Sequence, residues 1–294
     1  MWSERYAAID IGTNAVRLLV GRVHLKGSPR VEKELLVRVP LRLGNDVFSH
    51  KELTPESVRQ LLETMASFQH LISVFQPRAV RACATSAMRD SRNGDKVAAA
   101  IQEKTGLKLE VIDGKQEAEL IFSNRIDRLL ADRDSFLYID VGGGSTELNL
   151  FTEGRRFAYR SFNIGGVRIL KGAVPVGEEQ RLQEWVEEHA RQAGAVAIGS
   201  GGNIGRLHRL AKLEDGEPLP RKKLGQILAK LDGLTVEERM RTYKLKPDRA
   251  DVIVPAGNIY LQIMKWACIR TIHVPKFGLA DGLILHMCRQ HERV

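Results

Sequence analysis

Residues 8–20, AIDIGTNAVRLLV, have a near copy in residues 138–150, YIDVGGGSTELNL. Each stretch is an apolar strand that ends in an aspartate, Asp10 or Asp140, followed by a glycine-containing turn and a second strand. A turn without bulky side chains lets backbone N–H groups approach an anion, while the carboxylate stays available for a cation. One such turn is often an ordinary hairpin, but a repeat at an offset of 130 residues (140 − 10) is hard to obtain by chance. The repeat predicts two facing halves that bind phosphate.

The composition is that of an ordinary globular protein. A chain of 294 residues reaches the size at which single cores stop growing, so two domains are expected. The hydrophobic fraction of 43% and the charged fraction of 28% are typical of folded domains. No apolar run approaches the roughly 20 residues that span a bilayer, and the first residues lead directly into a strand without a signal peptide. We expect a cytoplasmic protein with no membrane partner.

The cysteines and histidines form no metal-binding pattern. Cys83, Cys268 and Cys288 are widely spaced and lack C-x-x-C pairing, which favours buried, reduced thiols over a structural zinc. The eight histidines include no H-x-x-x-H or H-E-x-x-H grouping, so we interpret them as surface or core residues.

The chain is strongly basic. Its 45 Lys and Arg against 36 Asp and Glu give a net charge of +9 and a pI of about 9.6. Such an excess attracts polyanions, which include nucleic acid, nucleotides and inorganic polyphosphate. The basic residues are spread along the chain without an arginine-rich tail or aromatic stripe, so no specific nucleic-acid partner is expected. A simple solvated basic surface is the alternative interpretation.

The hydrophobic pattern predicts two copies of a β-β-β-α-β-α unit. In the first copy the expected strands are 6–11, 15–23, 31–38, 79–82 and 109–112, with helices from Pro55, at 94–104 and at 116–130. In the second copy the expected strands are 136–141, 147–151, 157–162, 195–199 and 269–274, with helices at 178–193, 204–213, 222–231, 235–241, 250–266 and 282–289.

This duplicated arrangement resembles the actin-like ATPase architecture of actin, hexokinase and chaperone ATPases. The resemblance implies a two-domain α/β fold, related to ribonuclease H, with the active site in the interdomain cleft. The expected domains are 1–127, completed by a C-terminal helix at 283–294, and 128–282. Fold alone leaves the function open.

Ordered motifs narrow the resemblance to one family. They occupy residues 10–18, 84–94, 111–118, 140–147 and 199–203, with further matches at 163–168, 249–253 and 278–282. Together they resemble the exopolyphosphatase and guanosine pentaphosphate phosphohydrolase (Ppx/GppA) family over the whole chain, in a short form without the added C-terminal helical region of longer members. Ala280 departs from the basic residue that many members place before the acidic-glycine pair.

Hydrolysis of a terminal phosphoanhydride requires neutralisation of the nonbridging oxygens, a water positioned in line, and removal of its proton. Backbone N–H groups of the two turns, two arginines, and polar residues near a helix start are the predicted phosphate donors. These residues are Gly12, Thr13, Asn14, Arg17, Thr85, Ser86, Arg89, Asn93, Gly143, Gly144 and Ser145. Arg89 and Asn93 would share one helical face if the turn is already helical. Alternatively, Thr85 and Ser86 are simple helix caps.

Asp140 and Glu147 are the predicted metal ligands. Residues on either side of a tight turn can converge, so both carboxylates can face one Mg²⁺ whose octahedron is completed by water and phosphate. Asp10 would contribute from the opposite half, and K⁺ is a candidate activator. Arg17 occupies the position of the first repeat that corresponds to Glu147, because 17 − 10 and 147 − 140 are both 7.

The family resemblance implies that Glu117 is the general base. Its segment, residues 114–118, reads GKQEA, and the glutamate of that motif is the family's catalytic carboxylate. Many members carry a second acid where this chain has Gln116, so Glu117 would act as the base alone or together with Glu147. A solvent-facing glutamate at a helix start, paired with Lys115, is the plain alternative.

Residues 199–203, which include Gly201 and Gly202, resemble the adenosine motif of actin-like ATPases. They bind a nucleotide or line the basic cleft, and the sequence does not choose between these roles. The leading prediction for the whole chain is a Mg²⁺-dependent exopolyphosphatase. The alternatives are a guanosine pentaphosphate 5′-phosphohydrolase, a phosphotransferase, and a sensor of alarmone or polyphosphate without catalysis. The sequence leaves the oligomeric state open, with a homodimer as one candidate.

Overall fold

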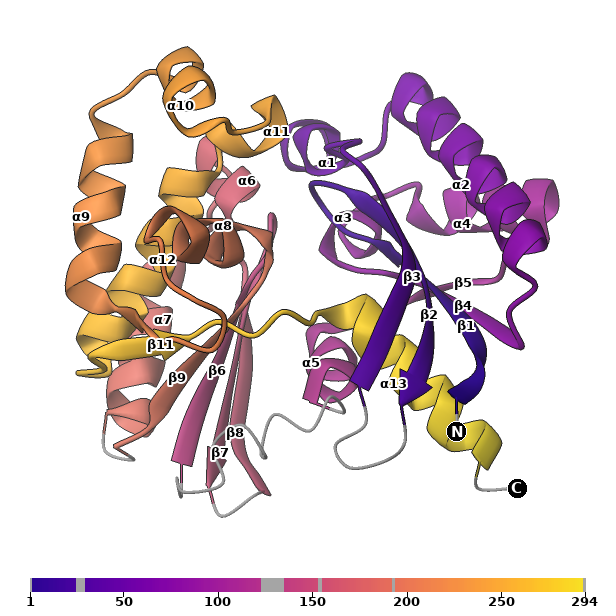
Figure 1. Ribbon diagram of the computed structural model, residues 1–294. Helices are drawn as coiled ribbons and strands as arrows, with labels where there is room; N and C mark the ends of the chain where they lie inside the picture. Colours follow the sequence, from indigo (N-terminus) through magenta and orange to yellow (C-terminus); the bar gives the residue numbers. More distant parts are fainter. Residues whose placement is uncertain (1, 25–29, 123–134, 153–154, 192–193, 293–294) are drawn as a thin grey trace. The chain divides into compact units, whose positions relative to one another are not determined.

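The computed structural model describes residues 2–24, 30–122, 135–152, 155–191 and 194–292 (Figure 1). The chain divides into two compact units. Unit 1 comprises Met1–Leu129 and Phe277–Val294, and unit 2 comprises Leu130–Lys276. The predicted domain boundary at 127/128, the end of the predicted helix 116–130 and the end of the predicted helix 178–193 lie outside the described residues.

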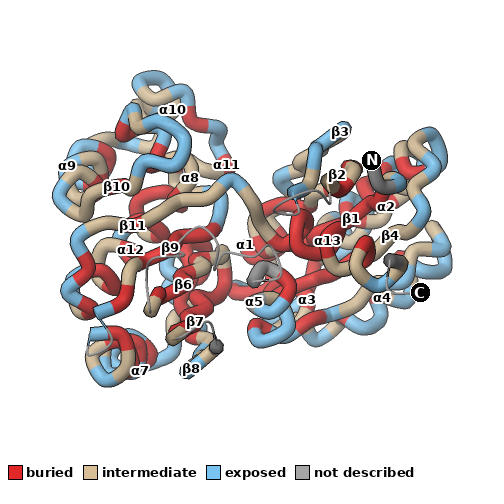
Figure 2. The backbone as a smooth tube through the Cα atoms, turned by 60° about the horizontal axis from the view of Figure 1, so that its bottom comes forward, coloured by how far each residue is buried: buried red, intermediate tan, exposed pale blue. Residues whose placement is uncertain are grey.

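Unit 1 contains a five-stranded sheet in the order β3-β2-β1-β4-β5. Its strands are β1 (Trp2–Ile11), β2 (Val16–His24), β3 (Arg30–Val39), β4 (Ala79–Ala84) and β5 (Leu109–Val111). The first three form an antiparallel meander, whereas β4 and β5 run parallel to β1. Because β1 is central and covered on both faces, its run of apolar residues is continuous and buried (Figure 2).

The helices of unit 1 cover both faces of this sheet. They are α1 (Gly44–His50), α2 (Pro55–Phe75), α3 (Ser86–Arg89), α4 (Gly94–Thr105), α5 (Gly114–Phe122) and α13 (Leu279–Glu292). Thr54 caps α2 by accepting a hydrogen bond from the Ser57 N–H at 3.3 Å, and Pro55 occupies the first helical position, as predicted. Helix α13 packs on β1 and β2 and against α5, so the C-terminal segment belongs to unit 1 (Figure 1).

Unit 2 repeats the strand order and extends it. Its sheet runs β10-β11-β9-β6-β7-β8. The strands are β6 (Ser135–Val141), β7 (Thr146–Thr152), β8 (Arg155–Phe162), β9 (Val196–Ser200), β10 (Leu219–Pro220) and β11 (Thr271–His273). The meander β6-β7-β8 is antiparallel, and β9 and β11 are parallel to β6. The two sheets therefore share the order 3-2-1-4-5 at corresponding strands, and the predicted α/β fold is confirmed.

The helices of unit 2 surround a single apolar cluster that is dominated by α12. They are α6 (Gly166–Leu170), α7 (Glu178–Trp185), the π-helical turn η2 (Val186–Ala190), α8 (Gly202–Leu210), α9 (Arg221–Asp232), α10 (Val236–Tyr243), α11 (Pro247–Ala250) and α12 (Ile253–Trp266). The predicted capping box of α10 is present, since Thr235 and Glu238 exchange side-chain and backbone hydrogen bonds of 3.2 and 2.8 Å.

Three expectations need correction. The helix predicted at 250–266 begins later, as α12 at Ile253, because Ala250 ends the separate short helix α11. Cys83 and Cys288 are buried free thiols as predicted, but Cys268 is exposed, because it lies in a left-handed turn just after α12. The prediction missed α1, which follows the meander directly. Within the described part of the chain, no helix is long and apolar enough to cross a membrane.

Candidate active-site residues in two hairpins

The turn between β6 and β7 presents three backbone N–H groups on one side. The carbonyls of Gly142, Gly143 and Gly144 all accept hydrogen bonds from the segment that begins α6: from the Gly166 N–H at 3.1 Å, from the Val167 and Arg168 N–H groups at 2.9 Å, and from Arg168 Nε at 2.7 Å. A peptide unit is planar and trans, so each carbonyl and the following N–H point in opposite directions. The N–H groups of Gly143, Gly144 and Ser145 therefore point away from α6.

These three N–H groups have no acceptor among the residues that the structure describes. By contrast, the Gly142 N–H closes the turn by donating to the Ser145 carbonyl at 2.9 Å. Backbone N–H groups are obligatory donors that require a partner when water is excluded. Three of them in succession form an anion-binding concavity of the kind that holds phosphate.

Close packing fixes this turn. A Cβ atom on Gly165 would lie 2.5 Å from the carbonyl carbon and oxygen of Gly143, so only glycine lets the α6 segment approach. Arg168 is 5% exposed and holds the Gly144 carbonyl. Its motif was noted in the sequence, but its role as a support for the turn was not predicted.

Asp140 and Glu147 flank the same turn on opposite strands, directly paired in register. Glu147 is 3% exposed, and its carboxylate accepts a hydrogen bond from Ser161 Oγ at 3.0 Å. Like charges directly opposite each other on a sheet are destabilising unless a cation offsets them. Mg²⁺ is usually bound through one or two carboxylates, with waters and phosphates as the other ligands. The two carboxylates fit that pattern, although the described residues contain no group of three or more potential His, Cys, Asp or Glu ligands.

Tyr260 joins the ends of β6 and β9 behind these carboxylates. Its hydroxyl donates to the Ser200 carbonyl and accepts from the Val141 N–H at 3.1 Å, and the side chain is fully buried. Burial raises the pKa of this phenol well above its usual value, and the charges of Asp140 and Glu147 raise it further. The residue was missed in the sequence because it lies within an apolar helical run, where only its hydroxyl signals a polar role.

The predicted nucleotide turn adjoins Asp140. Gly201 has φ of +112°, and a Cβ there would lie 3.1 Å from the Val141 carbonyl and 3.4 Å from Asp140 Oδ1. The conformation and the close approach both require glycine. Gly202 begins α8, and its carbonyl accepts a hydrogen bond from Arg249 at 3.0 Å.

The corresponding hairpin of unit 1 contains an ion pair. Asp10 and Arg17 are cross-strand partners, and Arg17 Nη1 lies 2.6 Å from Asp10 Oδ2. Asp10 is 6% exposed. A buried carboxylate held by an arginine already has a cation within its own hairpin. The prediction that Asp10 also binds a metal remains untested.

The unit 1 turn is supported as its counterpart is. The Gly12 N–H donates to the Ala15 carbonyl at 3.1 Å and so closes the turn. The carbonyls of Thr13 and Asn14 accept from the segment that begins α1, at 2.9 and 3.2 Å. The Gly12 N–H, a predicted phosphate donor, is thus engaged within the turn.

Thr85 and Ser86 lie beside this turn. The Thr13 and Ser86 hydroxyls are 2.7 Å apart and buried, and the Thr85 N–H donates to the Ile11 carbonyl at 3.1 Å. Thr85 occupies the cap position of α3, but its side chain makes no capping hydrogen bond. These contacts bring three predicted substrate residues, Thr13, Thr85 and Ser86, to the end of β1.

Arg89 and Asn93 do not share a helical face, because α3 ends at Arg89 and α4 begins after Asn93. Arg89 donates to the Ile112 carbonyl at 3.1 Å. The Asn93 amide donates to the Leu53 carbonyl at 2.8 Å and accepts from the Leu53 N–H at 3.0 Å. Asn93 therefore anchors the segment before α2, a structural role that its position in the motif did not reveal.

Glu117 lies in the first turn of α5 and is partly exposed. The Gln116 N–H donates to the Asp113 carboxylate at 2.7 Å, and the Asp113 N–H donates to Gln116 Oε1 at 3.1 Å, so the two residues cap the start of α5. Gln116 stands where the family resemblance implies an acid in many members. Burial raises the pKa of the Cys83 thiol to about 12; Arg81 opposes this shift, and the charges of Asp10 and Glu117 contribute to it. The Ile112 N–H, just after β5, donates to the Ala84 carbonyl at 2.9 Å, and Ala84 pairs with Ile11, so α5 and its Glu117 begin at the end of the sheet where Asp10 lies.

Comparison with known proteins agrees with these motifs. The model of the Ppx/GppA phosphatase family matches residues 37–291. "Exopolyphosphatase 2" of Mycobacterium tuberculosis (strain ATCC 25618 / H37Rv) is 28% identical over 315 residues, which cover 96% of this chain and 98% of the relative.

Two solved structures share the fold. The Ppx/GppA family member of Aquifex aeolicus has a TM-score of 0.78 at 22% identity and covers 99% of both chains. An exopolyphosphatase from Cytophaga hutchinsonii has a TM-score of 0.84 at 22% identity and covers 98% of both chains. The actin-like ATPase fold expected from the duplicated pattern is thereby confirmed.

Proposed function

Because the chain belongs to the Ppx/GppA phosphatase family, we propose that it is a phosphoanhydride hydrolase that releases terminal orthophosphate from linear inorganic polyphosphate. The observation that carries the proposal is the trio of N–H groups at Gly143, Gly144 and Ser145, all directed away from α6. Three convergent donors match the nonbridging oxygens of a phosphoryl group, whose charge spreads over those oxygens during transfer. Relatives named exopolyphosphatases support the substrate class.

In this proposal Glu117 orients the attacking water and accepts its proton. The transition state of phosphoryl transfer is loose, so the proton leaves late and a carboxylate of ordinary basicity suffices. Gln116 is engaged in capping α5, which leaves Glu117 as the carboxylate of this segment.

The substrate's phosphates are also bound by side chains of unit 1. Arg17 has further N–H donors beyond the one that binds Asp10, and an arginine can bind phosphate and carboxylate together. Thr13, Thr85 and Ser86 supply the hydroxyl and N–H groups at the end of β1.

Asp140 and Glu147 would hold Mg²⁺, which neutralises phosphate charge when bound. Ser161 keeps the Glu147 carboxylate oriented through its hydrogen bond. Binding of Mg²⁺ and activation by K⁺ are both part of the proposal.

Hydrolysis of guanosine pentaphosphate at its 5′ end is the second candidate. It needs the same phosphate chemistry plus a place for the base, and the glycine turn at Gly201 and Gly202 favours it by leaving backbone accessible beside Asp140.

The test is phosphate release by the purified protein from polyphosphate and from guanosine pentaphosphate, each with Mg²⁺ or with EDTA. We expect Mg²⁺-dependent release from polyphosphate. Glu117→Gln should lower kcat by about 100-fold or more, as expected for loss of a general base. Glu119→Gln, which removes the same charge from the same helix, is the matched control and should retain activity. Release from guanosine pentaphosphate alone would favour the second candidate, and full activity of Glu117→Gln would refute the assigned base.

A further inference from the structure

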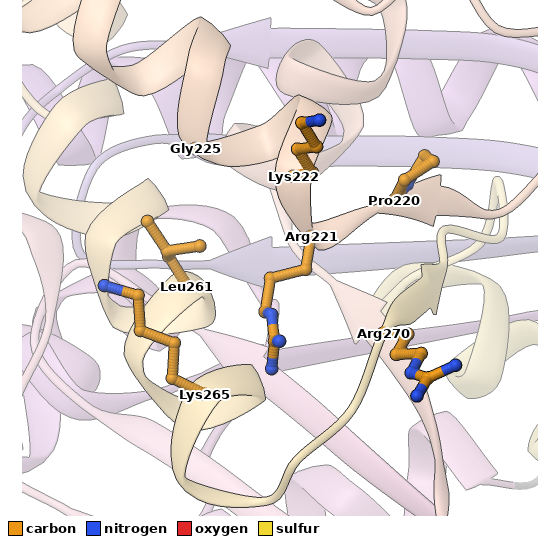
Figure 3. Close-up of a pocket in the computed structure, with 7 residues that line it drawn as sticks. All are labelled: Pro220, Arg221, Lys222, Gly225, Leu261, Lys265 and Arg270. Carbon is orange, nitrogen blue, oxygen red and sulfur yellow. The ribbon is translucent and has the colours of Figure 1, made fainter.

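Unit 2 contains a second cationic site that the proposed chemistry does not use. A cavity of about 530 Å³ opens between the start of α9, the end of α12 and the segment that leads into β11 (Figure 3). Its lining residues are Pro220, Arg221, Lys222, Gly225, Leu261, Lys265 and Arg270. This volume falls within the range of about 300 to 1,000 Å³ that is usual for small-molecule sites.

The charge of the lining is entirely positive. Arg221, Lys222, Lys265 and Arg270 contribute four cations, and no acidic residue lines the cavity. Among the residues that the structure describes, none of the four forms an ion pair. Like charges gathered in a concave site repel one another and raise the local concentration of anions.

Arg221 is held in place at the centre of this group. Its backbone N–H donates to the Arg270 carbonyl at 2.8 Å, and its Nη1 donates to the Met264 carbonyl at 3.1 Å. In Figure 3 the Arg221 side chain extends between Lys265, from α12, and Arg270. Since one of its N–H donors is used, the rest of the planar guanidinium remains available for an oxyanion.

The cavity lies at the opposite end of the unit 2 sheet from the phosphate-binding turn. Strands β6, β9 and β11 are parallel; Asp140 and Ser200 are at carboxyl ends, whereas Arg270 precedes the amino end of β11. An anion in the cavity is therefore separate from one bound at the turn.

The lining also indicates the class of anion. Among the residues described in unit 2, none that lines the cavity has an aromatic side chain on which a nucleobase could stack, and Pro220 and Leu261 are the apolar members of the lining. Arginine and lysine without a base platform suit phosphate groups themselves. We propose that this cavity is an accessory site for inorganic phosphate chains of two or more units.

The proposal is tested by chemical footprinting of the full-length protein in EDTA. Lysine acylation is followed by mass spectrometry with and without tripolyphosphate, at matched ionic strength. We expect tripolyphosphate to slow acylation of Lys222 and Lys265 about fivefold or more, and that of Lys223 and Lys230, which lie on α9 outside the cavity, by less than twofold. Equal rates at all four lysines would overturn the proposal, and stronger protection by GTP than by tripolyphosphate would overturn its ligand class.

Calorimetry with variants provides a second measurement. We expect the wild type to have two classes of tripolyphosphate site, one at the β6–β7 turn and one in the cavity. In the double variant Lys265→Ala/Arg270→Ala, the affinity of the cavity class should fall at least tenfold. Lys223→Ala/Lys230→Ala removes the same charge and should keep both classes. Lys230, Lys265 and Arg270 are exposed and Lys223 is half-buried, so we expect all four substitutions to preserve the fold, and thermal unfolding verifies it. Retention of both binding classes by the first variant would contradict the inference.

Discussion

The two hairpins have the same backbone and opposite electrostatics. In each, the first N–H after the aspartate strand closes the turn, and the segment after the third strand of the meander binds the turn's carbonyls. Across the strands, however, Asp10 faces Arg17 whereas Asp140 faces Glu147. One hairpin is neutralised by its own side chains, and the other combines two carboxylates.

In the proposed function, this difference lets one duplicated framework serve two roles. A neutral hairpin with a remaining arginine donor binds an anion directly. A hairpin with paired carboxylates needs a cation before an anion can approach. Strand order and turn geometry are therefore shared, while one pair of corresponding positions, 17 and 147, gives the two hairpins different charges.

The largest effect is expected from Glu147→Gln. Loss of one carboxylate should lower kcat/KM by about 100-fold or more, since outer-shell changes alone cost 10- to 100-fold at metal sites. It should leave thermal stability equal or higher, because it removes a like charge opposite Asp140. Kinetics at several Mg²⁺ concentrations, together with thermal unfolding, measure both effects. Unchanged Mg²⁺ dependence would contradict the assigned role.

Arg17→Gln should have the opposite effect on stability. It leaves the buried Asp10 carboxylate without its arginine, at a cost of about 1 to 3 kcal/mol in the free energy of unfolding. We also expect roughly a tenfold loss of kcat/KM from the missing phosphate donor. Arg22→Gln on the same strand is the control. It should lower the free energy of unfolding by about 1 kcal/mol or less, because Glu34, the partner of Arg22, also pairs with Arg5 and retains that ion pair. Equal destabilisation by both variants would remove the distinction between the hairpins.

Tyr260→Phe tests the support behind the carboxylate hairpin. The change leaves the Val141 N–H and the Ser200 carbonyl without their shared hydroxyl, which should cost about 1 to 3 kcal/mol. Denaturant unfolding measures this cost. Tyr243→Phe, at the half-buried end of helix α10, is the control, because its side chain is packed less deeply than that of Tyr260. Wild-type stability of Tyr260→Phe would show that the hydroxyl does not join the two strands.

The last prediction concerns the thiols, and it involves no change in a group of the proposed active site. Cys83 pairs with Asp10 in register, as Ser200 pairs with Asp140. Its pKa is raised to about 12, so its reactive thiolate is scarce at pH 8, and burial blocks access. A thiol reagent at pH 8 should therefore modify the exposed Cys268 at least about 100-fold faster than Cys83. Comparable rates would indicate that the end of β1 opens readily.

Local patterns predicted the features that depend on neighbouring residues. Thr54-Pro55 indicated the start of α2, and the aspartate-turn repeat indicated both hairpins, because these signals act within a few residues. The strands of both meanders followed from apolar runs.

Features that depend on distant contacts were not predictable. Tyr260 reaches strands more than 50 residues away along the chain, as its bond to Ser200, 60 residues distant, shows. Asn93 belongs to a predicted substrate motif, yet its amide binds Leu53, 40 residues away. A polar residue in a motif looks the same in the sequence whether its side chain binds substrate or the protein backbone. Only its tertiary contacts show which of these two roles it has.

In the proposed function, the N–H groups of Gly143, Gly144 and Ser145 bind phosphate. Amide NMR during titration with pyrophosphate tests this binding, with the Gly142 N–H, already bonded to Ser145, as the internal reference. We expect saturable downfield shifts of the three amide protons and little change at Gly142. Unmoved resonances for all three, under conditions where phosphate is released from polyphosphate, would contradict it.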